Sequence, residues 1–380
     1  QKLENGRIDF VMPDGRVFRV DAPNPGPVAE LHIHNSDTFA RLIREGDLGM
    51  SEAYLEGWWS TPDLQALMDV VHADNNEMYD SFSGGLQIVR VWERFRHWMN
   101  RNSKTQAKKN ISYHYDLGNE FYRLWLDDTM TYSSAIFETG QESLEKAQVA
   151  KYKSMVDQMG AKPGDHVLEI GCGWGGFAEY AAKERGLKVT GLTISQEQYD
   201  YARERINKAG LAEHVDIKLQ DYRDEKGTYD GIASIEMFEA VGEKYWPVYF
   251  DTLRDRLKPG RNATLQIITV DDARFEIYRK GVDFIQKYIF PGGMLPSPGA
   301  LRQEVERAGL NVLKSIEFGE SYSQTLRRWH ETFNLKWDDV ALLGFDGRFR
   351  RMWNFYLTSC AAGFHSGCID VTQITVTKPG

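Results

Sequence analysis

The run at positions 167–177 constrains the fold of this chain more than any other segment, because a short apolar strand leads directly into alternating glycines. Its sequence is VLEIGCGWGGF, in which the acidic Glu169 precedes Gly171, Gly173 and Gly175. Glycine has no Cβ, so the backbone can turn sharply out of the strand and approach a ligand closely. This strand, turn and helix pattern is typical of a site for a nucleotide-bearing cofactor.

The glycine spacing favours S-adenosylmethionine as that cofactor. The pattern E-x-G-x-G-x-G differs from the dinucleotide fingerprint G-x-G-x-x-G, and the acidic residue that would hold a ribose hydroxyl about 20 positions later is missing. Backbone N–H groups of the turn would meet the carboxylate of the cofactor, and Glu169 would organise the loop. A tight turn that binds no ligand is the alternative for this motif.

Strands and helices alternate beyond about residue 140 in the manner of a parallel sheet, which predicts a doubly wound α/β core. The predicted strands are 165–170, 187–192, 214–219, 230–235, 262–269, 312–318 and 369–376, and the main helices are 143–159, 176–185, 196–209 and 301–308. In an open α/β sheet, ligands bind at the carboxyl ends of the strands.

A smaller α+β domain is expected at the amino-terminal end. Alternation around Pro13-Asp14-Gly15 predicts a β-hairpin, and helical patterns follow from about Ser36 to Asp80. The polar break NRNSKTQAKKN sets the domain boundary near residue 100.

Composition narrows the class of partner and the compartment. The formal charge of −9 argues against nucleic acid as the main partner. No run reaches the roughly 18 apolar residues of a membrane span, and the first residues lack an apolar signal-peptide core. The 3 cysteines fit neither a disulfide framework nor a metal pair, so we expect a cytoplasmic protein without a metal site.

The segment 90–109 is basic and amphipathic, in contrast to the acidic chain as a whole. Seven cations face a single acidic residue there, and Trp92, Phe95 and Met99 recur at helical spacing. One face could enter a membrane interface while the cations meet anionic head groups. A domain linker whose charges are merely solvated is an equal alternative.

Several motifs, in order along nearly the whole chain, resemble the cyclopropane fatty acid synthases. The motifs are EGDLGMSEAYLEGWW, YHYDLGNEFYRLWLDDTMTYSSAIF, VLEIGCGWGGFAEYAA, GLTISQEQYDYA, LQDYRD, MFEAVG and KYIFPGGMLPS. The resemblance implies a Rossmann-like class I methyltransferase domain over residues 101–380, and a lipid-binding or dimerisation domain with a basic linker over residues 1–100. It also implies an enzyme at the inner membrane surface that uses S-adenosylmethionine on unsaturated phospholipid acyl chains, with a homodimer as one expected form.

The same resemblance implies a set of cofactor-binding residues. These are Tyr132 and Ser133 at the amino-acid end, Gly171 and Gly173 beneath it, Thr193 and Gln198 at the ribose, and Gln220, Asp221 and Tyr222 around adenine. A turn or core role is the alternative for each of them. For Asp221, an ordinary cap is the strongest rival.

The family closes its ring with a bound bicarbonate as base, held by a Cys, a Glu, a His, an Ile backbone group and a Tyr. Glu239, Ile268 and Tyr322 stand at matching positions, whereas Ser134 replaces the Cys and Gln266 replaces the His. Glutamine still donates an N–H bond but cannot become a cation. Bicarbonate is therefore a doubtful cofactor, and Glu239 is the expected proton acceptor if the anion is lost.

Methyl transfer to a C=C bond needs close alignment, a dry site and stabilisation of a carbocation. Aromatic faces stabilise a cation without trapping it. Phe121, Tyr122, Tyr288 and Tyr322 are among the candidates for this role, and His114 is a further candidate catalytic group. Most aromatic residues at such spacing are core residues.

Four functions stay open from the sequence. Bound bicarbonate predicts a cyclopropane, and its loss predicts a methyl-branched unsaturated chain. A methyltransferase for a soluble small molecule and a non-catalytic lipid-binding protein are the other two.

Overall fold

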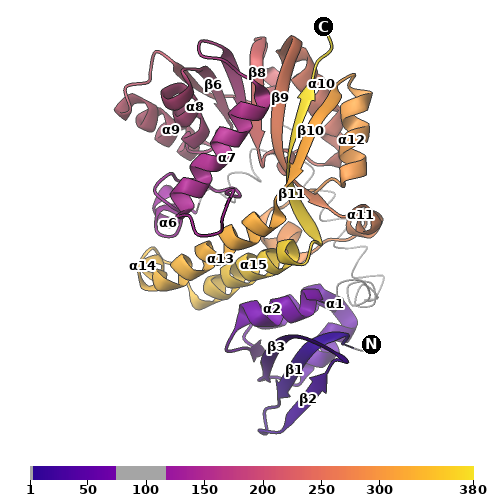
Figure 1. Ribbon diagram of the computed structural model, residues 1–380. Coiled ribbons are helices and arrows are strands. Elements are labelled where there is room, and N and C mark those ends of the chain that lie inside the picture. Colours follow the sequence, from indigo (N-terminus) through magenta and orange to yellow (C-terminus); the bar gives the residue numbers. More distant parts are fainter. Residues whose placement is uncertain (1–2, 74–116) are drawn as a thin grey trace. The chain divides into compact units, whose positions relative to one another are not determined.

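The computed structural model describes residues 3–73 and 117–380, which form two compact units (Figure 1). The first unit combines residues 3–73 with Ile277–Pro291 and Leu326–Ile369, and the second unit contains the rest of the described chain. The sequence predicts one boundary near residue 100, with residues 277–291 and 326–369 in the carboxyl-terminal domain. In the structure they return to pack with the amino-terminal segment.

A seven-stranded sheet forms the centre of the second unit. Its strands are β5 (His166–Ile170), β6 (Lys188–Thr193), β7 (Val215–Leu219), β8 (Tyr229–Ile235), β9 (Leu257–Val270), β10 (Asn311–Glu317) and β11 (Ile369–Thr377). They are ordered β10-β11-β9-β8-β5-β6-β7, with β5 to β9 parallel and β10 antiparallel to β11. The predicted Rossmann-like α/β fold is confirmed.

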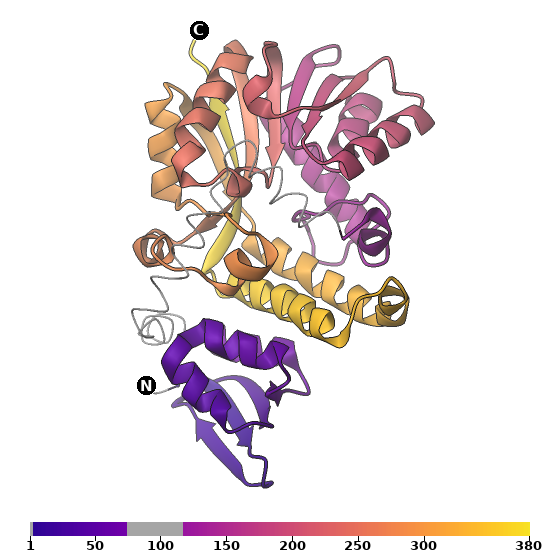
Figure 2. The same cartoon turned by 180° about the vertical axis from the view of Figure 1, so that it is seen from behind.

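Helices cover both faces of this sheet (Figures 1 and 2). One face carries α7 (Leu144–Met159), α8 (Gly176–Arg185) and α9 (Gln196–Lys208), and the other carries α10 (Trp246–Arg256) and α12 (Pro298–Arg307). Shorter elements are α6 (Asn119–Arg123), α11 (Asp272–Tyr278), η1 (Tyr222–Asp224), η2 (Phe238–Ala240) and η3 (Glu243–Tyr245).

Local sequence sets the ends of the helices that frame the sheet. The side chains of Ser143 and Ser195 accept backbone N–H bonds at the amino ends of α7 and α9. Gly160 ends α7 with a φ of 70°, a conformation that other residues rarely adopt. The apolar faces of α7, α8 and α9 then close a core on the sheet, in which Met155 and Phe177 are buried.

The glycine-rich turn joins β5 to α8 at the point where the strand order reverses. Gly171, Gly173 and Gly175 all have positive φ, at 82°, 52° and 84°. The N–H groups of Gly171 and Cys172 donate to the carbonyl of Leu192 in β6, at 3.0 and 2.8 Å. Because β6 lies on one side of β5 and β8 on the other, the carboxyl end of β5 is the switch point at which open α/β sheets bind ligands.

The first unit contains a four-stranded sheet in the order β2-β1-β3-β4. Its strands are β1 (Asn5–Val11), β2 (Val17–Asp21), β3 (Asn24–Ile33) and β4 (Trp59–Ser60), and its helices are α1 (Asp37–Leu55), α2 (Leu64–Ala73), α14 (Trp337–Leu342), α15 (Gly347–His365) and the end of α13 (Gly319–Leu335). β1 and β2 form the predicted hairpin, with Val11 opposite Val17.

Aromatic packing explains why distant segments join this unit. The ring of Phe355 in α15 lies 5.9 Å from the ring of Tyr54 in α1 and 4.6 Å from the ring of Phe284. Phe284 directly precedes the π-helical turn η4 (Ile285–Ile289). None of the helices in the described part of the chain is both long and apolar enough to cross a bilayer.

We expect Gly171→Ala to destabilise the protein more than Gly164→Ala. Both glycines have positive φ, at 82° and 89°, so either alanine costs about 1–2 kcal/mol of backbone strain. A Cβ at Gly171 would also lie 2.7 Å from the Cγ of Met237, whereas a Cβ at Gly164 meets nothing within 4 Å. Urea denaturation should show an additional loss of roughly 1–3 kcal/mol for Gly171→Ala. Equal losses would show that Met237 moves aside without cost.

Candidate functional site

The glycine turn leaves room where a cofactor is expected. A Cβ built on Gly173 would meet no atom within 4 Å, so this part of the turn has an open side. Beneath it, Glu169 of β5 is buried, and its Oε2 has no hydrogen-bond partner among the described residues. Burial raises the pKa of Glu169 to about 8, against the charges of Lys151 and Arg205. The open side of the backbone and a buried carboxyl group with an unsatisfied oxygen fit a polar ligand.

The predicted ribose-binding pair meets at the end of β6. The hydroxyl of Thr193 donates to the Oε1 of Gln198 at 2.8 Å, and Ser195 between them caps α9. This cap explains the local geometry, because it begins the helix close to the strand end and turns Gln198 back toward Thr193.

The three residues predicted around adenine follow β7. The Gln220 amide donates to Glu225 at 3.0 Å, and Tyr222 lies with its ring 5.6 Å from that of Tyr249. Asp221 caps η1 and accepts from the Arg223 guanidinium at 2.6 Å. The cap that rivalled the adenine role of Asp221 is therefore present in the structure.

The segment predicted at the amino-acid end of the cofactor is fixed by α7. Lys151 donates from Nζ to the Oγ of Ser133 at 2.6 Å, and the side chain of Gln148 donates to the carbonyl of Ser133 at 3.0 Å. The ring of Tyr132 lies 5.4 Å from that of Tyr122. Sequence reasoning missed Lys151, because a lysine on a helix is usually solvated.

Glu236, which follows β8 directly, is the second residue that the sequence reasoning missed. Its carboxylate accepts from the backbone N–H of Ser134 at 2.8 Å, from the Gln266 amide at 2.7 Å and from the Tyr322 hydroxyl at 2.6 Å. These are three of the groups predicted to hold bicarbonate. The φ of Glu236 is 50°, a strained value for a residue with a side chain. An acidic residue at the carboxyl end of a central strand was the available signal.

The other two groups predicted for bicarbonate bind each other. The Oε1 of Glu239 accepts from the backbone N–H of Ile268 at 2.5 Å. Its Oε2 is buried without a hydrogen-bond partner in the described ranges. The structure therefore brings all five predicted groups into one region, with Glu236 among them.

The two glutamates differ in the charge that they can carry. Burial, followed by the charge of Glu236, raises the pKa of Glu239 to about 8. Burial also raises the pKa of Glu236, but Tyr322, Lys151, Gln266 and the Ser134 N–H oppose this shift. Two carboxylates in different environments divide into one acid and one base. The three donors favour the ionised form of Glu236, whereas a single N–H donates to the side chain of Glu239.

A neighbouring amide fixes the direction of Gln266. Gln373 of β11 donates to the Oε1 of Gln266 at 3.0 Å, which leaves the NH₂ group of Gln266 to face Glu236. The Oε1 of Gln373 in turn accepts from Ser154 and Gln158 of α7, each at 2.6 Å. This chain of bonds presents a donor to Glu236, as a bound carboxylate requires.

The remaining predicted catalytic residues are placed elsewhere or lie outside the description. Tyr288 belongs to the first unit, where its hydroxyl donates to Glu52 at 2.7 Å. His114 and the basic segment 90–109 lie outside the described residues. Phe121 and Tyr122, two aromatic residues suggested for cation stabilisation, are fully buried core residues.

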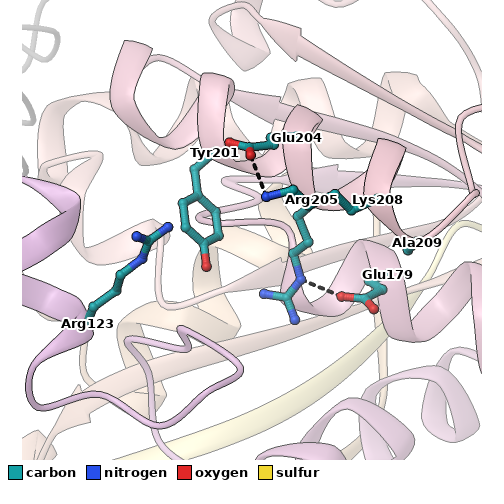
Figure 3. A pocket seen from close by; sticks show the side chains of 7 residues that line it. All are labelled: Arg123, Glu179, Tyr201, Glu204, Arg205, Lys208 and Ala209. Atoms are coloured by element: carbon teal, nitrogen blue, oxygen red, sulfur yellow. Dashed lines mark hydrogen bonds and ion pairs between the residues drawn. The ribbon is translucent and has the colours of Figure 1, made fainter.

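A cavity of about 350 Å³ in the second unit contains none of the predicted residues (Figure 3). It is lined by Arg123, Glu179, Tyr201, Glu204, Arg205, Lys208 and Ala209. Its charges already have partners, since Arg205 pairs with Glu179 and Lys208 pairs with Glu204. Arg123 lies over the ring of Tyr201.

Known proteins match this chain over most of its length. A tuberculostearic acid methyltransferase, UfaA1, from Mycobacterium tuberculosis is 40% identical over 92% of the chain and 83% of the relative. The cyclopropane-fatty-acyl-phospholipid synthase of Escherichia coli is 36% identical over 94% of the chain and 90% of the relative. Mycolic acid cyclopropane synthase CmaA1, solved with SAH and CTAB, matches with a TM-score of 0.67 and 30% identity over 71% of the chain and 98% of that structure.

The resemblance noted in the sequence is confirmed by these matches. The family model described as mycolic acid cyclopropane synthetase covers residues 102–374, which include the glycine turn and the glutamate cluster. The amino-terminal segment, outside that range, is covered in large part by the two full-length relatives. On this evidence the chain belongs to the mycolic acid cyclopropane synthetase family.

Proposed function

We propose that this protein transfers a methyl group from S-adenosylmethionine to the double bond of an unsaturated phospholipid acyl chain, and that Glu236 accepts the proton released afterwards. Relatives named as methyltransferases and as a cyclopropane synthase support the expected enzyme class and cofactor. The protein is an S-adenosylmethionine-dependent methyltransferase. One observation carries the assignment of the base, namely the three donors that bind the Glu236 carboxylate.

Bound S-adenosylmethionine supplies an electrophilic methyl group on a sulfonium. The open side of Gly173 and the unsatisfied Glu169 carboxylate fit its polar end. The residues that would hold it are Tyr132, Ser133, Glu169, Gly171, Gly173, Thr193, Gln198, Gln220, Asp221 and Tyr222.

Glu236 makes a separate bicarbonate unnecessary in this proposal. An anion at the predicted site would need the Ser134 N–H, the Gln266 amide and the Tyr322 hydroxyl, and all three already donate to Glu236. A second anion there would also be repelled by the Glu236 charge. The role of proton acceptor, expected for Glu239 from the sequence, therefore passes to Glu236.

The position of the base favours ring closure. Glu236 occupies the donors predicted for bicarbonate, whose task is to take a proton from the newly delivered methyl group. Removal of that proton yields a cyclopropane. A methyl-branched unsaturated chain is the second candidate, and it is favoured by a relative that is named for methyl transfer rather than for ring formation.

We also propose that the enzyme works at the inner surface of a phospholipid membrane. The basic, aromatic segment 90–109 supplies charge and apolar surface in one stretch. We assign lipid binding or dimerisation to residues 1–100 and catalysis to residues 101–380. Association into a homodimer stays a prediction.

Glu236→Ala should lower the activity of the enzyme, and added bicarbonate should restore it. Loss of a general base lowers kcat by about 10²–10⁴-fold. Added bicarbonate should restore much of this activity, because the variant frees the donors of Ser134, Gln266 and Tyr322. Wild-type activity should not change when dissolved bicarbonate is removed. Turnover of unsaturated phospholipid vesicles, measured with and without bicarbonate, checks both expectations.

Glu213→Ala is the matched control, because Glu213 is an exposed carboxylate in the same unit. It should behave as the wild type at every bicarbonate concentration. A wild type that stops working without bicarbonate, or Glu236→Ala with full activity in its absence, would contradict the assignment.

Trideuteromethyl S-adenosylmethionine should label the acyl chains of those vesicles. Ring closure removes one methyl deuteron, so we expect a cyclopropane that keeps two. A methyl-branched alkene that keeps all three would select the second candidate, with the proton lost from the chain. Mass spectrometry counts the deuterons, and proton NMR separates ring from alkene. Purified, folded enzyme that labels no acyl chain would refute the proposed substrate.

A further inference from the structure

One face of α7 carries a row of polar side chains that faces the sheet instead of solvent. Gln148 and Lys151 are fully buried, and Ser154 and Gln158 continue the row at spacings of three and four residues. Lysine is almost never fully buried unless a structural or functional need holds it there. Gln148 and Lys151 donate to Ser133, and Ser154 and Gln158 donate to Gln373. Ser133 precedes Ser134, and Gln373 bonds to Gln266, so both lead to donors of Glu236.

Lys151 is fully buried, and three carboxyl groups act on its charge. Its Nζ donates to the Oγ of Ser133 at 2.6 Å and lies 4.8 Å from the centre of the Tyr152 ring. Burial lowers the pKa of Lys151 to about 7, while the charges of Glu236, Asp127 and Glu169 act to raise it. These carboxylates come from three different parts of the second unit.

We propose that Lys151 is a positioning residue with two tasks, which are to keep Glu236 in its carboxylate form and to hold Ser133 at the amino-acid end of the cofactor. This inference rests on the proposed function, in which Glu236 is the base. Lys151 need not touch the substrate for either task.

The first task follows from charge. Burial of Glu236 favours its protonated form, which cannot accept a proton from the substrate. Opposite charge favours the ionised form, and Lys151 acts on Glu236 together with donors from Tyr322, Gln266 and the Ser134 N–H. The charge of Glu236 in turn raises the pKa of the neighbouring Glu239, and Lys151 is the cation that acts on Glu236.

The second task follows from the position of Ser133, which is joined directly to Ser134 in the chain. The hydroxyl of Ser133 accepts a hydrogen bond from Lys151, and its carbonyl accepts one from Gln148. Helix α7 therefore fixes both the side chain and the backbone of Ser133. The next residue, Ser134, donates its N–H to Glu236 at 2.8 Å. The segment that is predicted to meet the cofactor is therefore held in register with the base.

Two substitutions separate these tasks. Lys151→Gln removes the charge and keeps a donor for Ser133, whereas Lys151→Met removes both with a similar side-chain volume. The readouts are kcat and the KM for S-adenosylmethionine, measured from acidic to alkaline pH on unsaturated phospholipid vesicles. A thermal shift caused by S-adenosylhomocysteine identifies folded protein for each variant.

Activity that depends on an ionised Glu236 falls as the pH drops through its pKa. Loss of the Lys151 charge raises that pKa, so this acidic limb should move upward by about 1 pH unit in both variants. The KM for S-adenosylmethionine should rise severalfold in Lys151→Met and stay near the wild-type value in Lys151→Gln. Activity should recover in part at higher pH.

Lys153→Met is the matched control, because Lys153 lies on the exposed side of α7, where it pairs with Asp157. It should leave both the acidic limb and the KM unchanged. If both Lys151 variants lose kcat equally at every pH, the charge role is overturned. If Lys151→Met leaves the KM unchanged, the Ser133 role is overturned.

The outcome for Lys151 can be read separately from that for Glu236. Glu236→Ala with wild-type kcat at all pH values would end the proposed function itself. A bicarbonate-dependent Glu236→Ala together with an unmoved acidic limb in Lys151→Gln would end only this inference. If Lys151→Met does not fold, Lys151→Gln alone decides the charge role and Ser133→Ala decides the KM role.

Discussion

The rest of the site depends on the binding of one carboxylate by donors from three different segments. Glu236 follows β8, and its partners come from the segment before α7, from β9 and from α13. Each partner is held by other bonds, so the carboxylate meets donors that are already in place. A charged group in a dry site is stable only under this condition, because every missing hydrogen bond would carry a large desolvation cost.

The site also contains unfavourable features, which are informative because they persist. Glu236 adopts a positive φ, which costs roughly 1–3 kcal/mol. Glu239 stands close enough for the charge of Glu236 to raise its pKa, and Glu169 is buried with an unsatisfied oxygen. An ordinary core would replace such groups with apolar side chains. Backbone strain and perturbed carboxyl groups cluster at functional sites, and here both lie at the carboxyl ends of parallel strands.

The sequence predicted those parts of the site that have local signals. The glycine turn and Glu169 follow from a motif whose residues are close in sequence, whereas the Thr193–Gln198 pair is implied by the family resemblance. Ser134, Gln266 and Tyr322 could be grouped only through a family resemblance, since they are far apart along the chain. No local signal distinguishes Glu236, because its backbone conformation cannot be seen in the sequence. Glu239, which was predicted as the proton acceptor instead, lies three residues away. Lys151 could not be distinguished from a solvated lysine, since its helix also carries exposed lysines.

The division into domains could likewise be predicted only where the sequence has local patterns. The hairpin and the strand positions have local patterns, whereas the return of residues 277–291 and 326–369 to the first unit depends on long-range contacts such as that between Phe284 and Phe355. Those contacts also place Tyr288 beside Glu52, which no local pattern indicates.

A crystal structure of the wild-type enzyme with S-adenosylhomocysteine, grown in bicarbonate, tests the central claim most directly. The account predicts that the Glu236 carboxylate binds the Ser134 N–H, the Gln266 amide and the Tyr322 hydroxyl, with no separate anion among them. A planar carbonate bound to these three donors, with Glu236 turned away, would contradict it.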